Sequence, residues 1–511
     1  MANLRVKAIL LIFFLVLVFA ANLPFCLAVS WSPEMRLTTY PSTDILSSIT
    51  QTSDGRVWVL WQCKRINENG QDVYYKTYNF TGWSKDLRLI YDLGEDINPC
   101  LIQLQNQTLF LTWASNRYGN YEIFYKTSTN NGLSWTDPMR LTDYSEEDTN
   151  PAVVQLRNGS IWLVWRRRIV DNDEIFYRLY QGSSWGNEVQ FTNTNALDRM
   201  PSIMQASDNR VWIFWDSTPW GGENTEIFYR IYDGSSWTGD FQLTTSSYLD
   251  ADPSVVQTRD GAIWVVWYAH DPSLSNFQDD LFYKNSTNNG ATWSSTMQLT
   301  YNSTNDRWPA TAQINDKKLW VVWSGNTADI NYDIYYKTSD QLLFHDVAVA
   351  DIALSDDSVY QGVDVSIDVT AQNHGDFTEI LTVDCYANAT WIGNQVISLP
   401  SGGSTLLVFP WETSTFSPGR YYVNVTVAPV PNENIINLND NTLISDPMLL
   451  RILGDINADG RVDADDLSSL SAALGSAPGQ PKWNEECDLD GNSLVDVTDL
   501  YTLSLNYGRT I

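Results

Sequence analysis

Basic residues are scarce in this 511-residue chain. It has 31 Lys and Arg against 61 Asp and Glu, and only three His, so its formal net charge is −30 at pH 7. Such an excess of negative charge repels phosphate groups, which argues against nucleic-acid binding. The carboxylates suit an extracellular protein that binds calcium, although general solubility also accounts for much of the charge.

Cysteine is also scarce. Outside the N-terminal segment the chain has Cys63, Cys100, Cys385 and Cys487, which are too few and too scattered for a disulfide framework. A bridge between Cys63 and Cys100 stays open, because the sequence does not give their separation in space.

Long apolar runs are confined to the N-terminus, so we expect no membrane span in the rest of the chain. Arg5 and Lys7 precede an apolar run over residues 8–21, and Cys26-Leu27-Ala28 offers a small-residue cleavage site. This pattern predicts a cleaved export signal over residues 1–28; an uncleaved membrane anchor is the alternative. Seven Asn-x-Ser/Thr sequons agree with export, and glycosylation is expected at some of Asn79, Asn106, Asn158, Asn285, Asn302, Asn388 and Asn424.

Aromatic residues, in contrast, are abundant. The 22 Trp and 26 Tyr favour pleated sheets and hence an all-β protein. One apolar phrase, Val57-Trp58-Val59-Leu60-Trp61 in its first copy, recurs with a period of about 50 residues, which indicates a repeat architecture. Its closing tryptophans are Trp61, Trp113, Trp165, Trp215, Trp267 and Trp323. A second phrase, Asp72-Val73-Tyr74-Tyr75 in its first copy, also occurs six times.

Each repeat holds four short strands, and a sheet of that size cannot bury both faces alone. Radial stacking of the sheets predicts a six-bladed β-propeller over residues 29–343. The sixth repeat lacks its outer strand, and the segment near Trp31 can supply it. We therefore expect that segment to pair beside Tyr335-Tyr336 and close the ring. An open solenoid, the alternative, would need capping repeats.

Two turns, Ser128–Trp135 and Ser286–Trp293, read Ser-Thr-Asn-Asn-Gly-x-x-Trp. They resemble the Asp-box of sialidase-like, BNR-type propellers, with Asn where Asp is usual. In that family the box is a structural hairpin, so the resemblance implies a fold and not a chemistry. The Arg-Ile-Pro type motif that supplies the first active-site Arg of sialidases is not matched by Arg36-Leu37-Thr38, and sialidase activity is therefore not expected.

The period breaks at residue 344. Residues 344–452 alternate apolar with polar residues, contain Asn373-His374-Gly375-Asp376, and close with Asn439-Asp440-Asn441. This segment looks like the CARDB family, an immunoglobulin-like β-sandwich common on prokaryotic surface proteins. The resemblance implies a spacer or adhesion module.

Two acidic loops with the spacing of EF-hand calcium ligands lie in residues 453–511. Calcium takes six to eight oxygens, here from loop positions 1, 3, 5, 7, 9 and 12, of which position 7 gives a backbone carbonyl. In the first loop these positions are Asp455, Asn457, Asp459, Arg461, Asp463 and Asp466. In the second they are Asp488, Asp490, Asn492, Leu494, Asp496 and Asp499. Position 6 is Gly460 and Ser493, and the serine is expected to weaken the second turn. A helical apolar pattern follows each loop, so we expect a small α-helical module that binds two calcium ions.

Aspartate at position 12 and the absence of an entering helix resemble type I dockerins, from Gly454 to about Gly508. The resemblance implies that the helices dock onto a cohesin domain of a scaffold protein. In that family loop positions 10 and 11 often carry a Ser-Thr pair that contacts the partner. Here they are Ala464-Asp465 and Val497-Thr498, so the resemblance does not imply which cohesin is bound.

An aspartate recurs once in each repeat, in the link that leads into the innermost strand of the blade. The six are Asp44, Asp96, Asp148, Asp198, Asp250 and Asp306. Because acid–base chemistry needs asymmetry, we interpret them as residues that pin their own blades through backbone N–H groups. Residues that break the sixfold pattern on the loops expected at the same face of the ring are better ligand candidates, namely Arg117, Tyr118, Arg167, Trp220, Arg307 and Trp308. Aromatic faces stack on sugars and arginines bind acidic groups, although arginines pairing with the aspartates is the alternative.

Two functions fit these features. The first is a secreted, cell-surface-associated protein whose propeller recognises a polysaccharide or surface glycan, while its dockerin docks it onto a cohesin-bearing scaffold. The alternative is a dockerin-borne glycoside hydrolase or polysaccharide lyase in polysaccharide catabolism, by analogy with the usual cargo of dockerins. The sequence contains no Ser-His-Asp set, phosphate loop or zinc-ligand spacing.

Overall fold

The computed structural model describes residues 29–511, apart from residues 66–69, 92–93, 183, 220–221, 223, 248, 271–277, 302–304, 327–330, 432 and 435–436. The expected export signal over residues 1–28 and the candidate ligand residue Trp220 lie outside the described residues. Within the described ranges no helix is long and apolar enough to cross a membrane.

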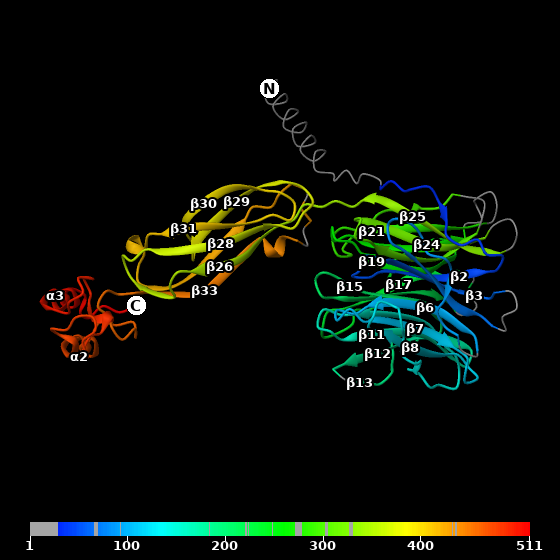
Figure 1. Ribbon diagram of the computed structural model, residues 1–511, viewed down its shortest axis with the longest axis horizontal. Helices are drawn as coiled ribbons and strands as arrows, with labels where there is room; N and C mark the ends of the chain where they lie inside the picture. Colours follow the sequence, from blue (N-terminus) through cyan, green and yellow to red (C-terminus); the bar gives the residue numbers. More distant parts are fainter. Residues whose placement is uncertain are drawn as a thin grey trace, which may run out of the picture. The chain divides into compact units, whose positions relative to one another are not determined.

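The described chain is mainly β, and its first part is a propeller-like series of antiparallel sheets, one per repeat (Figure 1). We call the sheets blades 1 to 6. Blade 1 contains β2 (Asp44–Gln51), β3 (Val57–Cys63), β4 (Asp72–Tyr78) and β5 (Leu87–Arg88). Blade 2 contains β6 (Asp96–Gln103), β7 (Leu109–Ser115), β8 (Glu122–Ser128) and β9 (Met139–Arg140). Blade 3 contains β10 (Asp148–Gln155), β11 (Ile161–Ile169), β12 (Asn172–Gln181), β13 (Ser184–Trp185) and β14 (Val189–Gln190).

The remaining three sheets follow the same order. Blade 4 contains β15 (Leu197–Gln205), β16 (Val211–Thr218), β17 (Glu226–Tyr232) and β18 (Phe241–Gln242). Blade 5 contains β19 (Leu249–Gln257), β20 (Ile263–His270), β21 (Asp279–Ser286) and β22 (Met297–Gln298). Blade 6 contains β23 (Asp306–Gln313), β24 (Lys318–Asn326), β25 (Tyr332–Gln341) and, from the start of the chain, β1 (Met35–Arg36).

The two ends of this region share blade 6. Strand β1 runs antiparallel to β25, with Met35 opposite Tyr336 and Arg36 opposite Tyr335. The guanidinium of Arg36 also pairs with Asp333 at 2.5 Å. The expectation that the N-terminal segment completes the last blade is thereby confirmed.

Residues of the propeller-like region fall into two compact units, the first holding blades 1, 2 and 6 and the second most of blades 3, 4 and 5. Within each unit neighbouring blades share tryptophan-rich cores. Trp61 of blade 1 and Trp320 of blade 6 belong to one such core, and Trp212 of blade 4 and Trp267 of blade 5 belong to another. The five residues of the tryptophan phrase are buried in the second strand of every blade, because both faces of the strand pack on other parts of the protein there.

Glutamines join neighbouring blades by directional hydrogen bonds. The Oε1 atom of Gln51 in blade 1 accepts the N–H of Asn315 in blade 6 at 2.7 Å, and Gln103 of blade 2 accepts that of Ser53 in blade 1 at 2.6 Å. In the same way, Gln205 accepts the N–H of Arg157 and Gln257 accepts that of Ser207. A glutamine occupies this position in all six repeats, as Gln51, Gln103, Gln155, Gln205, Gln257 and Gln313. Each of these four bonds satisfies a turn N–H of the preceding blade.

The two Asp-box-like turns are hydrogen-bonded hairpins that dock on the preceding blade. In the second, Asn288 Oδ1 accepts the Ser286 hydroxyl at 3.0 Å and the Thr292 N–H at 2.9 Å. Gly290 lies against Trp212 so closely that an added Cβ would lie 2.4 Å from the indole. A Cβ added to Gly132 in the first turn would likewise lie 2.5 Å from the indole of Trp58. The boxes therefore have a packing role.

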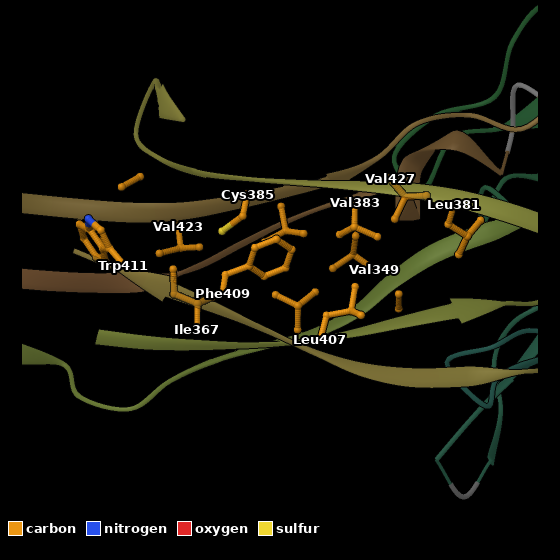
Figure 2. Packing of buried hydrophobic residues seen from close by; sticks show 14 of the residues in the cluster. Val349, Ile367, Leu381, Val383, Cys385, Leu407, Phe409, Trp411, Val423 and Val427 are labelled. Carbon is orange, nitrogen blue, oxygen red and sulfur yellow. The ribbon is translucent and has the colours of Figure 1, made fainter. Parts of the chain in front are cut away.

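Residues 347–451 form a β-sandwich. One sheet has the order β26 (Val347–Leu354), β28 (Val365–Asn373) and β31 (Ser404–Trp411). The other has the order β27 (Ser358–Tyr360), β33 (Thr442–Arg451), β32 (Gly419–Val427), β29 (Glu379–Ala387) and β30 (Thr390–Leu399). Alternate residues of β28 and β29 point inward, and Ile367, Val383, Phe409 and Trp411 fill the space between the sheets (Figure 2). Short 3₁₀ turns are η1 (Thr413–Thr415) and η2 (Leu438–Asp440).

The C-terminal module contains η3 (Glu485–Cys487) and two helices, α2 (Ala464–Ala473) and α3 (Val497–Asn506). Asp463 caps α2 and Asp496 caps α3, each in a capping box with the aspartate three residues on. All four cysteines of the described chain are free, so the Cys63–Cys100 bridge that the sequence left open is not formed. The Sγ of Cys63 instead lies 3.1 Å from the hydroxyl of Ser42.

Candidate functional site

The first predicted calcium loop wraps its backbone around its last aspartate. Asp466 is buried, and its Oδ1 accepts the N–H groups of Ile456 at 2.7 Å and Asn457 at 3.1 Å. Its Oδ2 accepts the N–H of Asp463 at 2.8 Å. The carboxylate at position 12 therefore ties the start of the loop to the first turn of α2.

The second loop repeats these bonds 33 residues later. Asp499 is also buried, and its Oδ1 accepts the N–H groups of Leu489 at 2.6 Å and Asp490 at 3.2 Å. Its Oδ2 accepts the N–H of Asp496 at 2.7 Å. Equivalent bonds at equivalent positions show that the two loops have the same local fold.

The other predicted ligands turn their oxygens back into the loops. Asp455 accepts from the N–H groups of Asp459 and Gly460, and Asn457 Oδ1 accepts that of Asp459 at 3.0 Å. In the second loop Asp488 accepts from Asn492 and Ser493. The side chains of Asp490 and Asn492 accept from Asn492 and Leu494 respectively. Arg461 and Leu494 were expected to contribute only backbone carbonyls, and that role stays a prediction.

Both loops make the left-handed turn that position 6 requires. Gly460 has φ of 85° and Ser493 has φ of 66°. The serine therefore adopts the conformation that glycine adopts freely, at a cost of about 1 kcal/mol. The serine is thus expected to weaken the second turn through this energetic cost, while the turn keeps the left-handed conformation seen in the first loop.

The donor set fits calcium. One carboxylate oxygen from each of Asp488, Asp490 and Asp499 lies within 4.8 Å of the others, as ligands about 2.3–2.6 Å from a shared ion would. In the first loop burial raises the pKa of Asp455, and the charges of Asp466 and Asp459 raise it further. These carboxylates repel one another, and a hard divalent cation with oxygen ligands removes that repulsion.

The two helices present different faces. Val497, Tyr501 and Leu505 follow one another at four-residue intervals along α3 and are 72%, 65% and 66% exposed. The equivalent positions of α2, 33 residues earlier, hold Ala464, Ser468 and Ala472. The module thus carries an exposed apolar stripe on α3, which we call the α3 stripe, and only small side chains on the equivalent face of α2.

The six repeated aspartates are buried inside their blades. In blades 2, 4 and 5 the closing tryptophan of the same repeat donates its indole N–H to the aspartate. Trp113 bonds to Asp96 at 2.8 Å, Trp215 to Asp198 at 3.2 Å and Trp267 to Asp250 at 2.8 Å. Sequence reasoning expected backbone donors, and it missed these indoles because their pairing depends on strand register. A buried indole N–H requires an acceptor, and these carboxylates supply it.

The predicted ligand arginines are engaged in ion pairs. Arg117 pairs with Asp96 at 2.9 Å, Arg167 pairs with Glu188 at 2.8 Å, and Arg307 pairs with Asp279. Arg117 and Arg167 are largely buried, whereas 36% of the Arg307 side chain is exposed. The Arg117 pair matches the alternative in which arginines neutralise the repeated aspartates, whereas Glu188 and Asp279 are not among those six residues.

Tyr118 and Trp308, the two described aromatic candidates, are accessible to different degrees. Tyr118 is 69% exposed, and Trp308 is half-buried with its ring centroid 5.4 Å from that of Tyr332. Trp308 also has φ of 55° on the bulge of β23, a conformation that recurs two residues after each repeated aspartate. A ligand role for these residues stays a prediction.

Blade 4 contributes to a cavity of about 470 Å³ that sequence reasoning missed. Trp215 and Phe228 supply its aromatic lining, Asp198, Glu226 and Asp240 supply its carboxylates, and Pro219 also lines it. Pro219 directly precedes the undescribed Trp220. Cavities of a few hundred cubic ångströms with aromatic walls and a few polar groups are typical of small-molecule sites.

Residues 453–505 match the family described as "Dockerin type I domain". Together with the two loops, this match shows that the chain carries a type I dockerin domain at its C-terminus, a calcium-binding module that docks onto cohesins. No curated protein matches the chain.

Solved structures that are similar to part of the chain include the following three. A protein of unknown function from Dyadobacter fermentans DSM 18053 is 10% identical, with 61% of this chain and 99% of that chain covered and a TM-score of 0.52. An α-L-arabinanase from Penicillium chrysogenum is 14% identical, with 60% and 98% covered and a TM-score of 0.48. The NanB sialidase from Streptococcus pneumoniae is 11% identical, with 61% and 70% covered and a TM-score of 0.46. The first similarity shows a shared fold alone, and the TM-scores of the other two are too low to bear on function.

Proposed function

We propose that this is a secreted modular protein that is docked onto a cohesin-bearing scaffold and recognises a polysaccharide or surface glycan. Residues 29–343 form a closed six-bladed propeller that binds the glycan, and residues 344–452 form a CARDB-like spacer. Residues 453–511 bind two calcium ions and dock. The observation that carries this proposal is the pair of equivalent calcium loops inside the dockerin match.

Docking uses the α3 stripe. A cohesin must bury an apolar surface to bind tightly, and exposed aromatic and aliphatic side chains on one helix face supply it. The equivalent face of α2 offers only small side chains, so the two helices do not provide interchangeable docking surfaces in this chain.

Replacing Tyr501 with serine is expected to weaken cohesin binding by about tenfold or more, because an exposed aromatic anchor is removed from the interface. The matched control is Ser468→Ala at the equivalent position of α2, which should leave binding unchanged. Surface plasmon resonance of the full chain over a panel of cohesin domains measures both. If Ser468→Ala weakens binding as much as Tyr501→Ser, the assignment to α3 is wrong.

Recognition is better supported than catalysis in the propeller-like region. The three aspartates Asp96, Asp198 and Asp250 serve as acceptors for buried indoles, which is a structural role. A hydrolase or lyase would need asymmetric buried carboxylates, and Asp216 is one. Burial raises its pKa to about 6.

The position of Asp216 nevertheless indicates a joint between blades. Its Oδ2 accepts the N–H of Asp252 in blade 5 at 3.0 Å. Gln62 accepts the equivalent N–H of Asn98, and Ser324 accepts that of Leu46. Because glutamine and serine make the same bond elsewhere, the carboxylate of Asp216 has a structural explanation. The enzymatic alternative gains no support from it.

Replacing Trp308 or Tyr118 with alanine is expected to weaken glycan binding by about tenfold each, through loss of ring stacking on a sugar face. The control is Phe80→Ala in the turn between β4 and β5, which in a propeller lies on the opposite face. A glycan array probed with the full chain, followed by product analysis of each hit, measures binding and turnover. Binding unchanged by both substitutions would place the site elsewhere, and released products would favour the enzyme.

A further inference from the structure

A polar cluster lies at one end of the sandwich, where three elements meet. Asp346 directly precedes β26, His374 directly follows β28, and Asp440 ends η2. Strands β26 and β28 are antiparallel with Val347 opposite Asn373, which brings Asp346 beside His374. One ligand atom from each of Asp346, His374 and Asp440 lies within 4.8 Å of the other two.

Asp346 is the buried member of the cluster. It is 9% exposed, and among the described residues its Oδ1 has no hydrogen-bond partner. Leaving a buried carboxylate oxygen unbonded is costly. Its environment adds to that cost, because the negative charges of Asp440 and Glu433 act on the carboxylate of Asp346.

Glu433 does not relieve this cost, since its own oxygens are occupied. Its Oε1 accepts the N–H of Val347 at 2.9 Å, and its Oε2 accepts from Val430 and Asn441. A positive charge beside Asp346 would therefore be attracted by three carboxylates.

His374 has the arrangement of a metal-binding imidazole. Its Nε2 lies 2.7 Å from Oε1 of Gln372, a contact in which a neutral imidazole donates its Nε2–H and keeps its lone pair on Nδ1. Metal-ligating histidines usually donate their second N–H to an oxygen in this way. Nδ1 lies 3.8 Å from Oδ2 of Asp440, too far for a hydrogen bond. Two ligands of one zinc ion lie roughly 3.4 Å apart in tetrahedral geometry, close to this spacing.

We propose that Asp346, His374 and Asp440 bind one divalent transition-metal ion of the zinc class. The imidazole determines the class, because nitrogen suits zinc, whereas calcium takes oxygen ligands. Asp346 supplies the buried anion, and the half-exposed side chains of His374 and Asp440 leave the ion a path from solvent. The ion joins the start of β26, the end of β28 and η2, and it stabilises this end of the sandwich.

Isothermal titration of the full chain with Zn²⁺, in excess calcium to saturate the dockerin loops, tests the proposal. His374→Gln and Asp346→Asn are each expected to lower the affinity of one Zn²⁺ by at least about tenfold. His345→Gln is the matched control, because His345 instead pairs with Glu379 at 2.6 Å, and it should bind Zn²⁺ as the wild type does. Equal Zn²⁺ binding by wild type and His374→Gln overturns the site. The proposal is also overturned, in favour of an all-oxygen site, if Asp346→Asn binds one calcium ion fewer than the wild type while His374→Gln binds as many.

Thermal unfolding supplies a second measurement that does not depend on titration. In chelator Asp346→Asn should unfold at no lower a temperature than wild type, because the substitution removes a buried charge without a partner. Added Zn²⁺ should raise the unfolding temperature of wild type and of His345→Gln but not of His374→Gln. His374 is 47% exposed, so its substitution leaves the sandwich folded. A Zn²⁺-induced rise of equal size in His374→Gln contradicts the proposal.

Discussion

Chelation of calcium is expected to unfold residues 453–511 and leave the rest of the chain folded. The module has a small core, built around residues such as Val462, Leu470 and Leu503. The free energy gained by burying so small a core nearly equals the conformational-entropy cost of folding. Metal binding therefore supplies the net folding free energy. Without the ion the buried carboxylates also repel one another. The measurement is circular dichroism of residues 453–511 with and without chelator, with hydrogen exchange of the full chain to show that the blades stay protected.

The double substitution Asp466→Ala and Asp499→Ala should have the same effect in calcium. Each change removes the position-12 ligand and the acceptor of three backbone N–H groups. We expect calcium affinity to fall by about 100-fold or more at each site, which is about 2.8 kcal/mol. Asp465→Ala is the control, since this neighbouring aspartate is not a predicted ligand, and it should change stability by less than about 0.5 kcal/mol. Helical signal that persists unchanged in chelator would refute the calcium mechanism.

Gly290→Ala is expected to destabilise the propeller-like region by about 3 kcal/mol. Part of the cost is the left-handed backbone, since Gly290 has φ of 79°, and part is overpacking. The added Cβ would lie 2.4 Å from the ring of Trp212. Trp212 is buried and stacked on Tyr229, so it cannot move aside easily.

Gly55→Ala separates the two causes. Gly55 has φ of 85°, but a Cβ there would have no atom within 4 Å, so only the backbone cost of about 1 kcal/mol is expected. Urea unfolding followed by tryptophan fluorescence reports mainly on the blades, where most of the indoles lie. Equal destabilisation by the two substitutions would show that the contact with Trp212 contributes nothing.

The repeats could be predicted because each is encoded locally. The recurring tryptophan phrase marks the buried second strand of every blade, and the incomplete sixth repeat indicated that β1 pairs with β25. The glutamines at the blade joints were missed although they recur six times. Their partners are backbone N–H groups of the preceding repeat, such as that of Asn315 for Gln51, and a residue pattern does not name backbone partners.

The site residues likewise differ in how far the sequence alone could predict them. The calcium loops are contiguous, so their spacing alone located Asp466 and Asp499. The arginines were chosen for asymmetry, but whether Arg167 faces a ligand or a carboxylate depends on Glu188, which only the fold brings near. Asp346, His374 and Asp440 form no spacing motif, and only the sandwich brings them together.

The central claim is tested most directly by capturing the full chain on an immobilised cohesin in the presence of calcium. Candidate polysaccharides, and then chelator, are passed over the captured chain. The account predicts that the captured chain retains one polysaccharide intact and that chelator releases the chain and the polysaccharide together. Capture that is insensitive to chelator, or a captured chain that retains none of the polysaccharides, would contradict it.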